Sequence, residues 1–441
     1  MDTTSATSHP DQPPPGLAAA PVEIPPLMKQ RDFRALLGAR FTNSLAMSAL
    51  VTVVGFQVYA MTGDPLALGW LGLVEAIPAL SLVLFGGYVA DRHDRRRIIV
   101  ITSALVTGCA AALGLLAADG ASGILPILAV VFVTGIGSGF ERPALTAFEA
   151  QVIPRVQAVQ GVSYTSSVSQ AGGILGPLTG GIALVVIGIA GTYAAMAVLL
   201  AISTVCLALI PRRPMPEIVA GEPRLQSLLD GIRYVRRTPA LLGSMALDLF
   251  AVFFGGAIAL LPVFATDVLH VGPIGLGIMR TAPSIGALGV MLIATRRPPS
   301  RHAGRTLLIC VAGFGASMIV FGLSTTFALS VLALFVSGVT DGLSMVIRQT
   351  ILRVLSPERI RGRVASVNWI FIGASNELGA FESGFAAHAF GTVPSVVGGG
   401  VLTLGVVGLV ALAVPSLRGL DLDRAEPVDD GPPEASSALA A

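Results

Sequence analysis

Residues 66–118 read LALGWLGLVEAIPALSLVLFGGYVA-DRHDRRR-IIVITSALVTGCAAALGLLAA, two long apolar runs on either side of a short charged loop. A helix of about 20 residues, rising about 1.5 Å per residue, crosses a bilayer core of about 30 Å. Both runs are long enough. In lipid the backbone must satisfy its own hydrogen bonds, so a run of this length spans as a helix. The stretch therefore predicts two membrane-spanning helices joined by a basic loop.

The same pattern extends over most of the chain. Of its 441 residues, 53% are hydrophobic and 12% are charged, with a mean hydropathy of +0.79, which excludes a set of soluble domains. The predicted fold class is an all-α polytopic membrane protein with twelve transmembrane helices in two six-helix halves. We expect the spans at residues 34–61, 66–90, 98–118, 124–146, 161–186, 191–210, 240–265, 273–294, 305–324, 327–349, 364–388 and 393–414.

The spans divide into two halves. Residues 34–210 form the N-terminal half and residues 240–415 the C-terminal half, and 211–239 are a linker with an amphipathic helix expected on the membrane face. The polar segments 1–33 and 416–441 are expected to be disordered. The halves repeat each other, because Pro65-x-x-Leu68-Gly69 returns as Pro273-x-x-Leu276-Gly277. Parallel repeats of this kind are typical of transporters with a substrate site between the halves.

Basic residues predict the orientation. The expected spans place all but one of the 28 Lys and Arg residues on a single side, and the exception is Arg280. Cytoplasmic loops carry the excess of Lys and Arg in membrane proteins. We therefore expect a multi-pass protein of the cell (inner) membrane with both termini in the cytoplasm.

The loop between the first two quoted runs has an ordered pattern. A helix ends in small residues at Gly86-Gly87, an acid stands at the boundary, and a cationic cluster follows. Any inner loop of a bacterial membrane protein can be basic, so basicity alone decides little. The ordering is more specific, because Asp91 stands where it can meet a helix N-terminus and an arginine. We interpret it as a breakable latch with these members: Gly87, Asp91, Arg92, Arg95 and Arg96.

This string resembles the signature between helices 2 and 3 of the major facilitator superfamily, Gly-x-Leu-Ala-Asp-Arg-x-Gly-Arg-Arg. The matching residues are Gly87, Ala90, Asp91, Arg92, Arg95 and Arg96. It departs at Asp94, where the family usually has glycine, and this form is similar to the branch of enterobactin exporters and transmembrane secretion effectors. The resemblance implies the major facilitator fold and transport by alternating access.

A second motif lies in the span at 161–186. Its residues are Gly172, Gly176, Pro177, Gly180 and Gly181. Glycines four residues apart let helices approach closely, so a packing face explains part of the pattern. The whole string resembles the motif of proton antiporters in the same superfamily. That resemblance implies a hinge bent at the proline, and it favours export over import.

Five charged residues are expected inside the membrane: Glu75, Asp248, Arg280, Asp341 and Glu377. Bare charges in hydrocarbon are costly, so such groups should face the bundle interior or a wet cavity. One interpretation is structural, with the acids paired to Arg280 or capping a kink. The other is proton coupling, in which an acid meets different surroundings in two states and binds or releases a proton. Glu75 has the best depth for that role, followed by Asp248 and Asp341.

Several classes of function are excluded by missing patterns. The only lysine, Lys29, follows no Gly-rich loop, so the chain has no P-loop and uses no ATP by that route. Cys109, Cys206 and Cys310 are widely separated, and no His/Cys/carboxylate spacing suggests a metal. We expect no enzyme activity, no cofactor and no nucleic-acid partner.

The predicted function is a proton-coupled antiporter that exports a small amphipathic molecule of the drug or siderophore class. The expected partners are the lipid bilayer, the solute and protons, and the protein is expected to be a monomer. Two alternatives stay open: an uncoupled facilitator or importer of a small metabolite, and a receptor or assembly partner that transports nothing.

Overall fold

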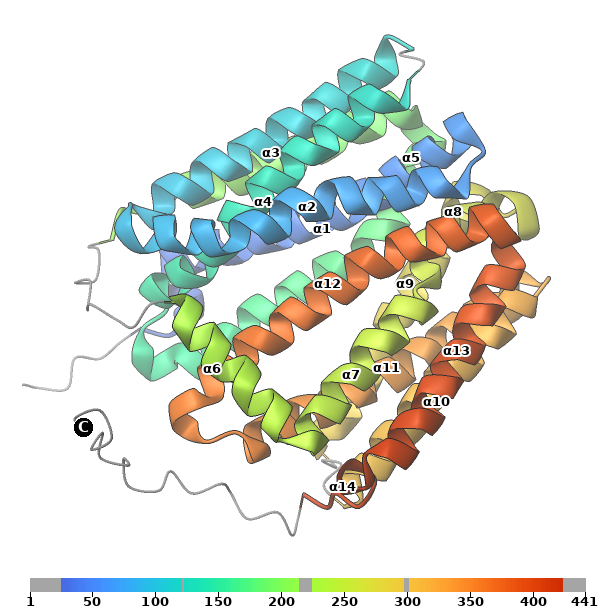
Figure 1. Ribbon diagram of the computed structural model, residues 1–441. Coiled ribbons are helices and arrows are strands. Elements are labelled where there is room, and N and C mark those ends of the chain that lie inside the picture. The colour runs from blue at the N-terminus through green and yellow to red at the C-terminus, as the bar shows by residue number, and fades with distance from the viewer. Residues whose placement is uncertain (1–24, 121–122, 214–223, 297–300, 423–441) are drawn as a thin grey trace, which may run out of the picture.

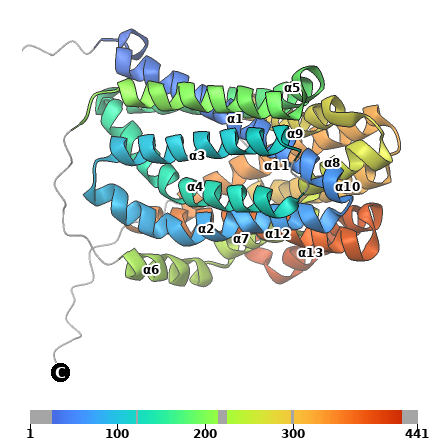
Figure 2. The ribbon, with the colours of Figure 1, turned by 90° about the horizontal axis from the view of Figure 1, so that it is seen from above.

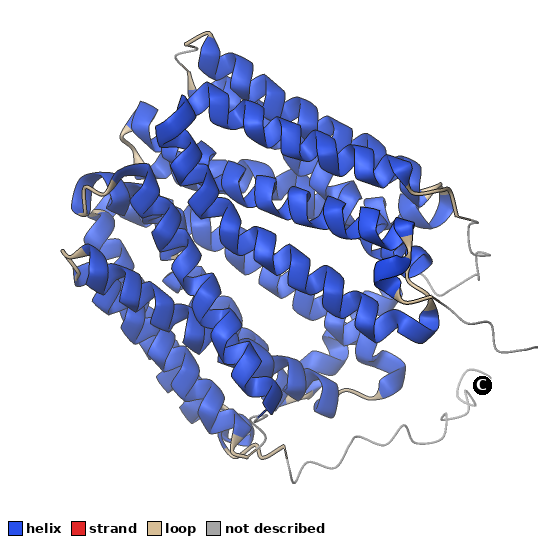
Figure 3. Ribbon diagram, turned by 180° about the vertical axis from the view of Figure 1, so that it is seen from behind, coloured by secondary structure: helices blue, strands red, loops and turns tan. Residues whose placement is uncertain are grey.

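The computed structural model describes residues 25–120, 123–213, 224–296 and 301–422, and no strand occurs within these ranges (Figure 3). The helices of the N-terminal half are α1 (Arg31–Thr62), α2 (Pro65–Arg92), α3 (Arg95–Ala118), α4 (Ile124–Val152) and α5 (Ala158–Leu209). Those of the C-terminal half are α7 (Pro239–Gly255), η3 (Ala257–Leu260), α8 (Leu261–Val263), η4 (Phe264–Val268), α9 (Gly272–Arg296), α10 (Ala303–Leu323), α11 (Phe327–Leu355), α12 (Glu358–Phe390) and α13 (Thr392–Ala413). The shorter elements are η1 (Leu27–Lys29), η2 (Arg155–Gln157), α6 (Arg224–Arg237) and α14 (Pro415–Arg418). The all-α prediction is confirmed.

Helices α2 and α3, which contain the two apolar runs of residues 66–118, each begin after a capping aspartate. Asp64 caps α2 by accepting a hydrogen bond from the Leu66 backbone N–H, and Pro65 occupies the first helical position. Asp94 caps α3 in the same way, with the Arg96 N–H 3.0 Å from its Oδ1. Such caps satisfy backbone donors that the first turn leaves unpaired.

Helix α5 doubles back on itself at Gly188. That residue has φ 71° and ψ 179°, which a glycine adopts without strain. The Ser44 hydroxyl donates to the Ser169 carbonyl before the break, and the Ser203 hydroxyl donates to the Ala39 carbonyl after it. Both arms therefore lie along the same part of α1. The sequence prediction of two spans separated near residues 187–190 agrees with this reversal.

Ten segments of the described chain are long and apolar enough to cross a membrane. One of them is Arg155–Leu209, with 55 residues, which contains both arms of α5. Helix α12 is not among the ten. By length and composition these segments fit a multi-pass architecture, whereas the count of twelve spans stays a prediction.

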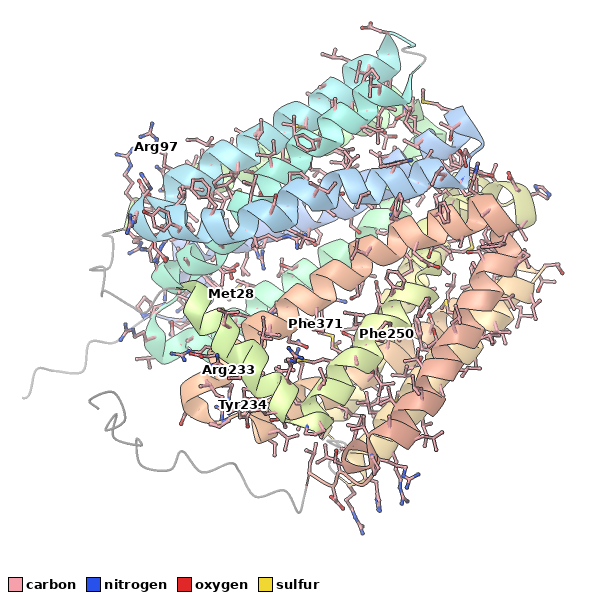
Figure 4. All side chains as sticks on the ribbon, in the orientation of Figure 1. Met28, Arg97, Arg233, Tyr234, Phe250 and Phe371 are labelled. Atoms are coloured by element: carbon pink, nitrogen blue, oxygen red, sulfur yellow. The ribbon has the colours of Figure 1, made fainter. Side chains whose placement is uncertain are left out.

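The two halves lie side by side and come together at one end (Figures 1 and 2). We call this the closed end, and it carries the α1–α2 and α12–α13 turns, at residues 63–64 and 391. We call the other the basic end, because Lys and Arg residues gather there. It carries η1 with Lys29, the α2–α3 loop with Arg92–Arg97, and α14 with Arg418. Arg97 marks the basic end in Figure 4.

The hydrophobic core follows the same division. At the closed end a single cluster joins both halves, and it includes Val58 and Tyr193 of the N-terminal half and Phe264 and Phe321 of the C-terminal half. Toward the basic end the buried apolar residues form two separate clusters, one within each half. Among the described residues, apolar packing thus joins the halves at the closed end.

Helix α6 docks on the C-terminal half. Its Tyr234 hydroxyl donates to the Leu355 carbonyl at 2.6 Å, and its Asp230 pairs with Arg363 at 3.1 Å. Arg233 and Tyr234 are labelled on α6 in Figure 4. The helix expected in the linker therefore exists, while residues 214–223 of that linker lie outside the described residues.

The expectation of disorder at the two ends is wrong for their inner parts. Near the N-terminus, η1 forms and Leu27 and Phe33 are buried, because both side chains join the apolar cluster of the N-terminal half. After α13, helix α14 buries Leu417, and the Gly304 N–H donates to the Leu420 carbonyl. Residues 1–24 and 423–441 lie outside the described residues.

Candidate functional site

Polar pairs join the two halves at the closed end. The Tyr59 hydroxyl of α1 donates to the Asp267 carboxylate of η4. His388 of α12 lies with Nδ1 2.9 Å from Oδ1 of Asp64, the cap residue of α2. These contacts link the ends of α1 and α2 to the ends of the C-terminal helices, so they must break if the closed end opens.

Glycines allow the same ends to approach backbone to backbone. A Cβ atom at Gly277 of α9 would lie 2.6 Å from the Pro177 carbonyl oxygen of α5, and one at Gly181 of α5 would overlap the Pro273 carbonyl oxygen of α9. Real Cβ atoms do not come so close to backbone atoms. Any larger side chain at these two positions is therefore incompatible with the closed end as it stands.

The other glycines of the predicted hinge motif serve packing within one half. Cβ atoms at Gly172, Gly176 and Gly180 would meet α1 at 2.8, 2.6 and 3.1 Å. The Ser48 hydroxyl of α1 also donates to the Gly173 carbonyl at 3.0 Å. The motif is thus divided: three glycines fit α5 against α1, whereas Gly181 and Pro177 meet the opposite half.

The predicted latch lies at the basic end. Asp91 is half exposed, with Oδ1 4.0 Å from Nη2 of Arg95. Arg95 donates to the Ala147 carbonyl of α4, Arg96 donates to the Ala208 carbonyl of α5, and Arg92 stacks over the ring of Tyr88. Gly87 lies in the last turns of α2. These contacts all lie within the N-terminal half.

Two of the predicted embedded acids share one arginine. Arg348 of α11 pairs with Asp248 of α7, and its Nη2 lies 3.6 Å from Oδ1 of Asp341. The Asp248 and Arg348 side chains are 10% and 13% exposed, whereas Asp341 is 51% exposed. We call these three residues the acid–arginine triad. They line a space of about 240 Å³ together with Ser344, whose buried hydroxyl has no hydrogen-bond partner among the described residues.

Arg280 lies apart from these acids. Its Nη1 donates to Oγ1 of Thr52 at 3.2 Å, a bond from α9 to α1 and hence between the two halves. The interpretation in which the acids pair with Arg280 does not hold for Asp248 and Asp341, because both turn to Arg348 instead.

Glu75 lines a recess of about 480 Å³ within the N-terminal half. Apart from Thr134, the other lining residues are apolar and come from α1, α2, α3 and α4. Glu75 follows Pro65 by ten residues, a rise of about 15 Å from the start of α2, so it lies near the middle of the span.

Glu377 belongs to α12 by its backbone, and its side chain lies outside the described residues. Among the described residues no three His, Cys, Asp or Glu side chains gather where they could hold a metal ion.

A model of the major facilitator superfamily matches residues 36–380, most of the chain. The chain belongs to the major facilitator superfamily. It is a multi-pass membrane transporter with a non-enzymatic role, and the resemblance found in the basic loop is confirmed.

Named relatives place this major facilitator protein beside exporters. It is 26% identical over 416 residues to the enterobactin exporter EntS of Citrobacter koseri, which covers 91% of this chain and 95% of the relative. It is also 26% identical over 394 residues to EntS of Escherichia coli O81, covering 86% and 91%. These bacterial relatives support an inner-membrane location.

Solved structures of other transporters share the fold. A mutant form of a POT peptide transporter superposes with a TM-score of 0.73 at 13% identity, covering 88% of this chain and 95% of the other. A bacterial homologue of the human lysosomal transporter Spinster, inward-facing and unoccupied, gives 0.67 at 15% identity, covering 88% and 97%. At such low identity these matches show the fold alone.

The sequence interpretation missed three groups of this transporter. The pattern of basic residues assigns Arg348 to the basic end, although it follows Asp341 by two helical turns and binds both acids of the triad. No pattern in the sequence predicts Thr52 as the partner of Arg280. Tyr59 and Asp267 were detectable, because they are 208 positions apart, the same offset that relates Pro65 to Pro273.

Proposed function

We propose that this transporter is a secondary active exporter that exchanges protons for a small amphipathic molecule by alternating access. The observation that carries the proposal is the likeness over nearly the whole chain to proteins named enterobactin exporters. The hinge motif at Gly172–Gly181, with its resemblance to proton antiporters, supports the same direction.

The division of the core supports alternation between two states. One apolar cluster joins the halves at the closed end, while each half keeps its own cluster toward the basic end. Rocking one half against the other would break the polar pairs and glycine contacts of the closed end and bring the basic ends together. Asp91 and its arginines stand where such a closure would give them new partners, as a latch requires.

The acid–arginine triad supports proton coupling by its charge balance. With both carboxylates ionised the triad carries a net charge of −1, and one proton makes it neutral. Asp248 is held in the buried pair, so the half-exposed Asp341 is the member that can exchange a proton with water. Glu75 is the corresponding candidate of the N-terminal half, and Glu377 stays a candidate on the sequence evidence.

Neutralising the exchanging acids is expected to uncouple transport. Glu75→Gln should abolish uphill export driven by a pH gradient, because an amide cannot carry a proton, while solute binding stays close to wild type. The measurement is flux in reconstituted vesicles with an imposed pH gradient, together with solute-induced proton release from the purified protein. Asp341→Asn is the parallel variant in the C-terminal half.

The matched control is Asp119→Asn, since Asp119 is an exposed carboxylate at the end of α3. It should leave flux and proton release unchanged. Undiminished uphill flux and proton release in Glu75→Gln would remove that residue from the mechanism. The same result in Asp341→Asn and Asp248→Asn as well would sink proton antiport and leave the uncoupled facilitator or importer.

We further propose that the basic end faces the cytoplasm. In a cysteine-less background, a cysteine at Gly120 or Thr325 should react with an impermeant maleimide added outside intact cells, because both positions are exposed near the closed-end side of the bundle. A cysteine at exposed His93 should react only after the membrane is opened. Labelling of position 93 in intact cells would reverse the orientation, and with it the proposed direction.

The remaining alternatives have their own outcomes. A receptor or assembly partner of transporter fold would move no solute in vesicles under any gradient.

We also propose that the protein is a monomer, because each half of the single chain supplies one side of the closed end. The molar mass of the protein in detergent tests this proposal.

A further inference from the structure

Arg280 is a partly buried cation placed between the two halves. It follows the first residue of α9 by eight positions, a rise of about 12 Å from the closed end, and its partner Thr52 precedes the end of α1 by ten, about 15 Å. The bond between them therefore lies at mid-depth, where the halves diverge toward the basic end. The Thr52 hydroxyl donates its own proton to the Ser48 carbonyl, so it meets the guanidinium as an acceptor.

Most of the hydrogen-bonding capacity of this guanidinium is unused. A guanidinium has five N–H donors, and the bond to Thr52 is the only one found among the described residues. Its Nε is fully covered and has no acceptor there. No described carboxylate lies within ion-pair distance of Arg280, in contrast to Arg348, which meets two.

An uncompensated cation at this depth is costly to hold. Bringing a charge out of water destabilises a protein unless an opposite charge or good hydrogen bonds replace the solvent. The two acids of α7 and α11 are already bound to Arg348. Among the described side chains no counter-charge for Arg280 is found, so a bound molecule that brings its own negative charge would compensate it.

We propose that Arg280 binds an acidic group of the transported molecule, so that the substrate is an amphipathic organic anion. A planar carboxylate or a phenolate can accept two parallel N–H bonds from the guanidinium, and bonds of this charged kind are about twice as strong as neutral ones. Val51 of α1, which precedes Thr52 and is 41% exposed, lines the recess of Glu75 and offers an apolar surface for a hydrophobic body. This inference rests on the proposed export function and names its substrate class.

The charge of the substrate also bears on the driving force. A membrane potential that is negative inside drives an anion out of the cell. Export of an anion is thus favoured even before a proton is exchanged. Binding between the two halves places the acid where both halves can hold it as they move.

The test uses three probes with one ring system: 2-naphthoate, 2-naphthamide and 2-naphthylmethylammonium. Binding to the purified protein is measured by calorimetry. The wild type should bind the anion at least about tenfold more tightly than the other two, since a charge-assisted bond contributes about 1.5–3 kcal/mol. Arg280→Gln should lose that preference, and Arg280→Lys should keep part of it. Arg305→Gln, an exposed arginine at the basic end, is the control and should bind as wild type does.

Stability gives a second readout. If Arg280 is uncompensated in the empty protein, Arg280→Gln should unfold at the same temperature as wild type or higher. A loss of stability as large as that of a paired arginine would overturn the proposal. No measurable binding of 2-naphthoate, equal binding of all three probes, or a preference that survives in Arg280→Gln would overturn it as well.

The proposed export function and the proposed role of Arg280 can be refuted independently of each other. If the anion binds through Arg280 and no solute is transported across the vesicle membrane, the binding site is supported and the export function is refuted. If the protein exports solutes without regard to their charge, the export function is supported and the role of Arg280 in binding an anion is refuted.

Discussion

Replacing Gly181 by leucine is expected to drive the two halves apart at the closed end. The added side chain would overlap the Pro273 carbonyl oxygen of α9, which belongs to the opposite half and to a helix backbone that cannot yield locally. Gly277→Leu should act in the same way against Pro177. A shift of the two states from 1:99 to 99:1 requires about 5.5 kcal/mol, within reach of steric overlap with a packed helix. Transport should fall sharply, because the protein can no longer return to the state described here.

Distances between spin labels measure this shift. One pair, at Met61 and Phe390, reports on the closed end, and the other, at His93 and Arg305, reports on the basic end. In Gly181→Leu the first distance should grow and the second should shrink. Gly108→Leu is the matched control, because a Cβ atom at Gly108 of α3 meets no atom within 4 Å. An unchanged closed-end distance in Gly181→Leu would show that the interface adapts without opening.

The latch variant Asp91→Asn is expected to shift the same equilibrium in the opposite direction. If closure of the basic end strengthens the interactions of Asp91 beyond those of the described state, its neutralisation destabilises the closed basic end by about 1–3 kcal/mol more than it destabilises the described state. The closed-end state should then be favoured, transport should weaken, and folding should change little. Wild-type transport and wild-type distances in Asp91→Asn would show that the latch inferred from the family does not operate in this chain.

Removing the arginine of the acid–arginine triad is expected to cause the largest loss of stability. Arg348→Met keeps the length of the side chain but leaves Asp248 buried beside no cation. Breaking one partner out of a buried pair typically costs about 3–5 kcal/mol. We expect that loss in the free energy of unfolding, measured by titration with SDS in mixed micelles.

Two companion variants separate the charge from the packing. Asp248→Asn combined with Arg348→Met should recover most of the loss, since the buried carboxylate is then neutral and Asp341, the remaining acid of the triad, is half exposed. Asp341→Asn alone should change stability by no more than about 1 kcal/mol, because a half-exposed carboxylate is solvated and screened. If the double variant is as unstable as Arg348→Met, the arginine stabilises the bundle by packing rather than by charge.

For some of the charged residues, though not for Arg348, the sequence predicts how far along its span the residue lies. Counting residues from the end of each apolar run placed Glu75, Asp248 and Arg280 at depth, and the helices begin and end close to the expected positions. The reversal at Gly188 was equally local, because it depends on one glycine and its short flanks.

The sequence alone determined that the chain is a multi-pass helical membrane protein of two repeated halves, and the ordered string at Gly87–Arg97 determined its family. Both follow from local chemistry: apolar length, the side that carries the arginines, and residues adjacent in the chain. Only the tertiary structure decided that Asp248 and Asp341 turn to Arg348, that Arg280 reaches Thr52, and that Gly181 meets the opposite half. A hydropathy pattern gives the depth of a residue, but the rotation of each helix and the choice of its neighbours come from packing among helices far apart in the chain, and packing decides which charges meet.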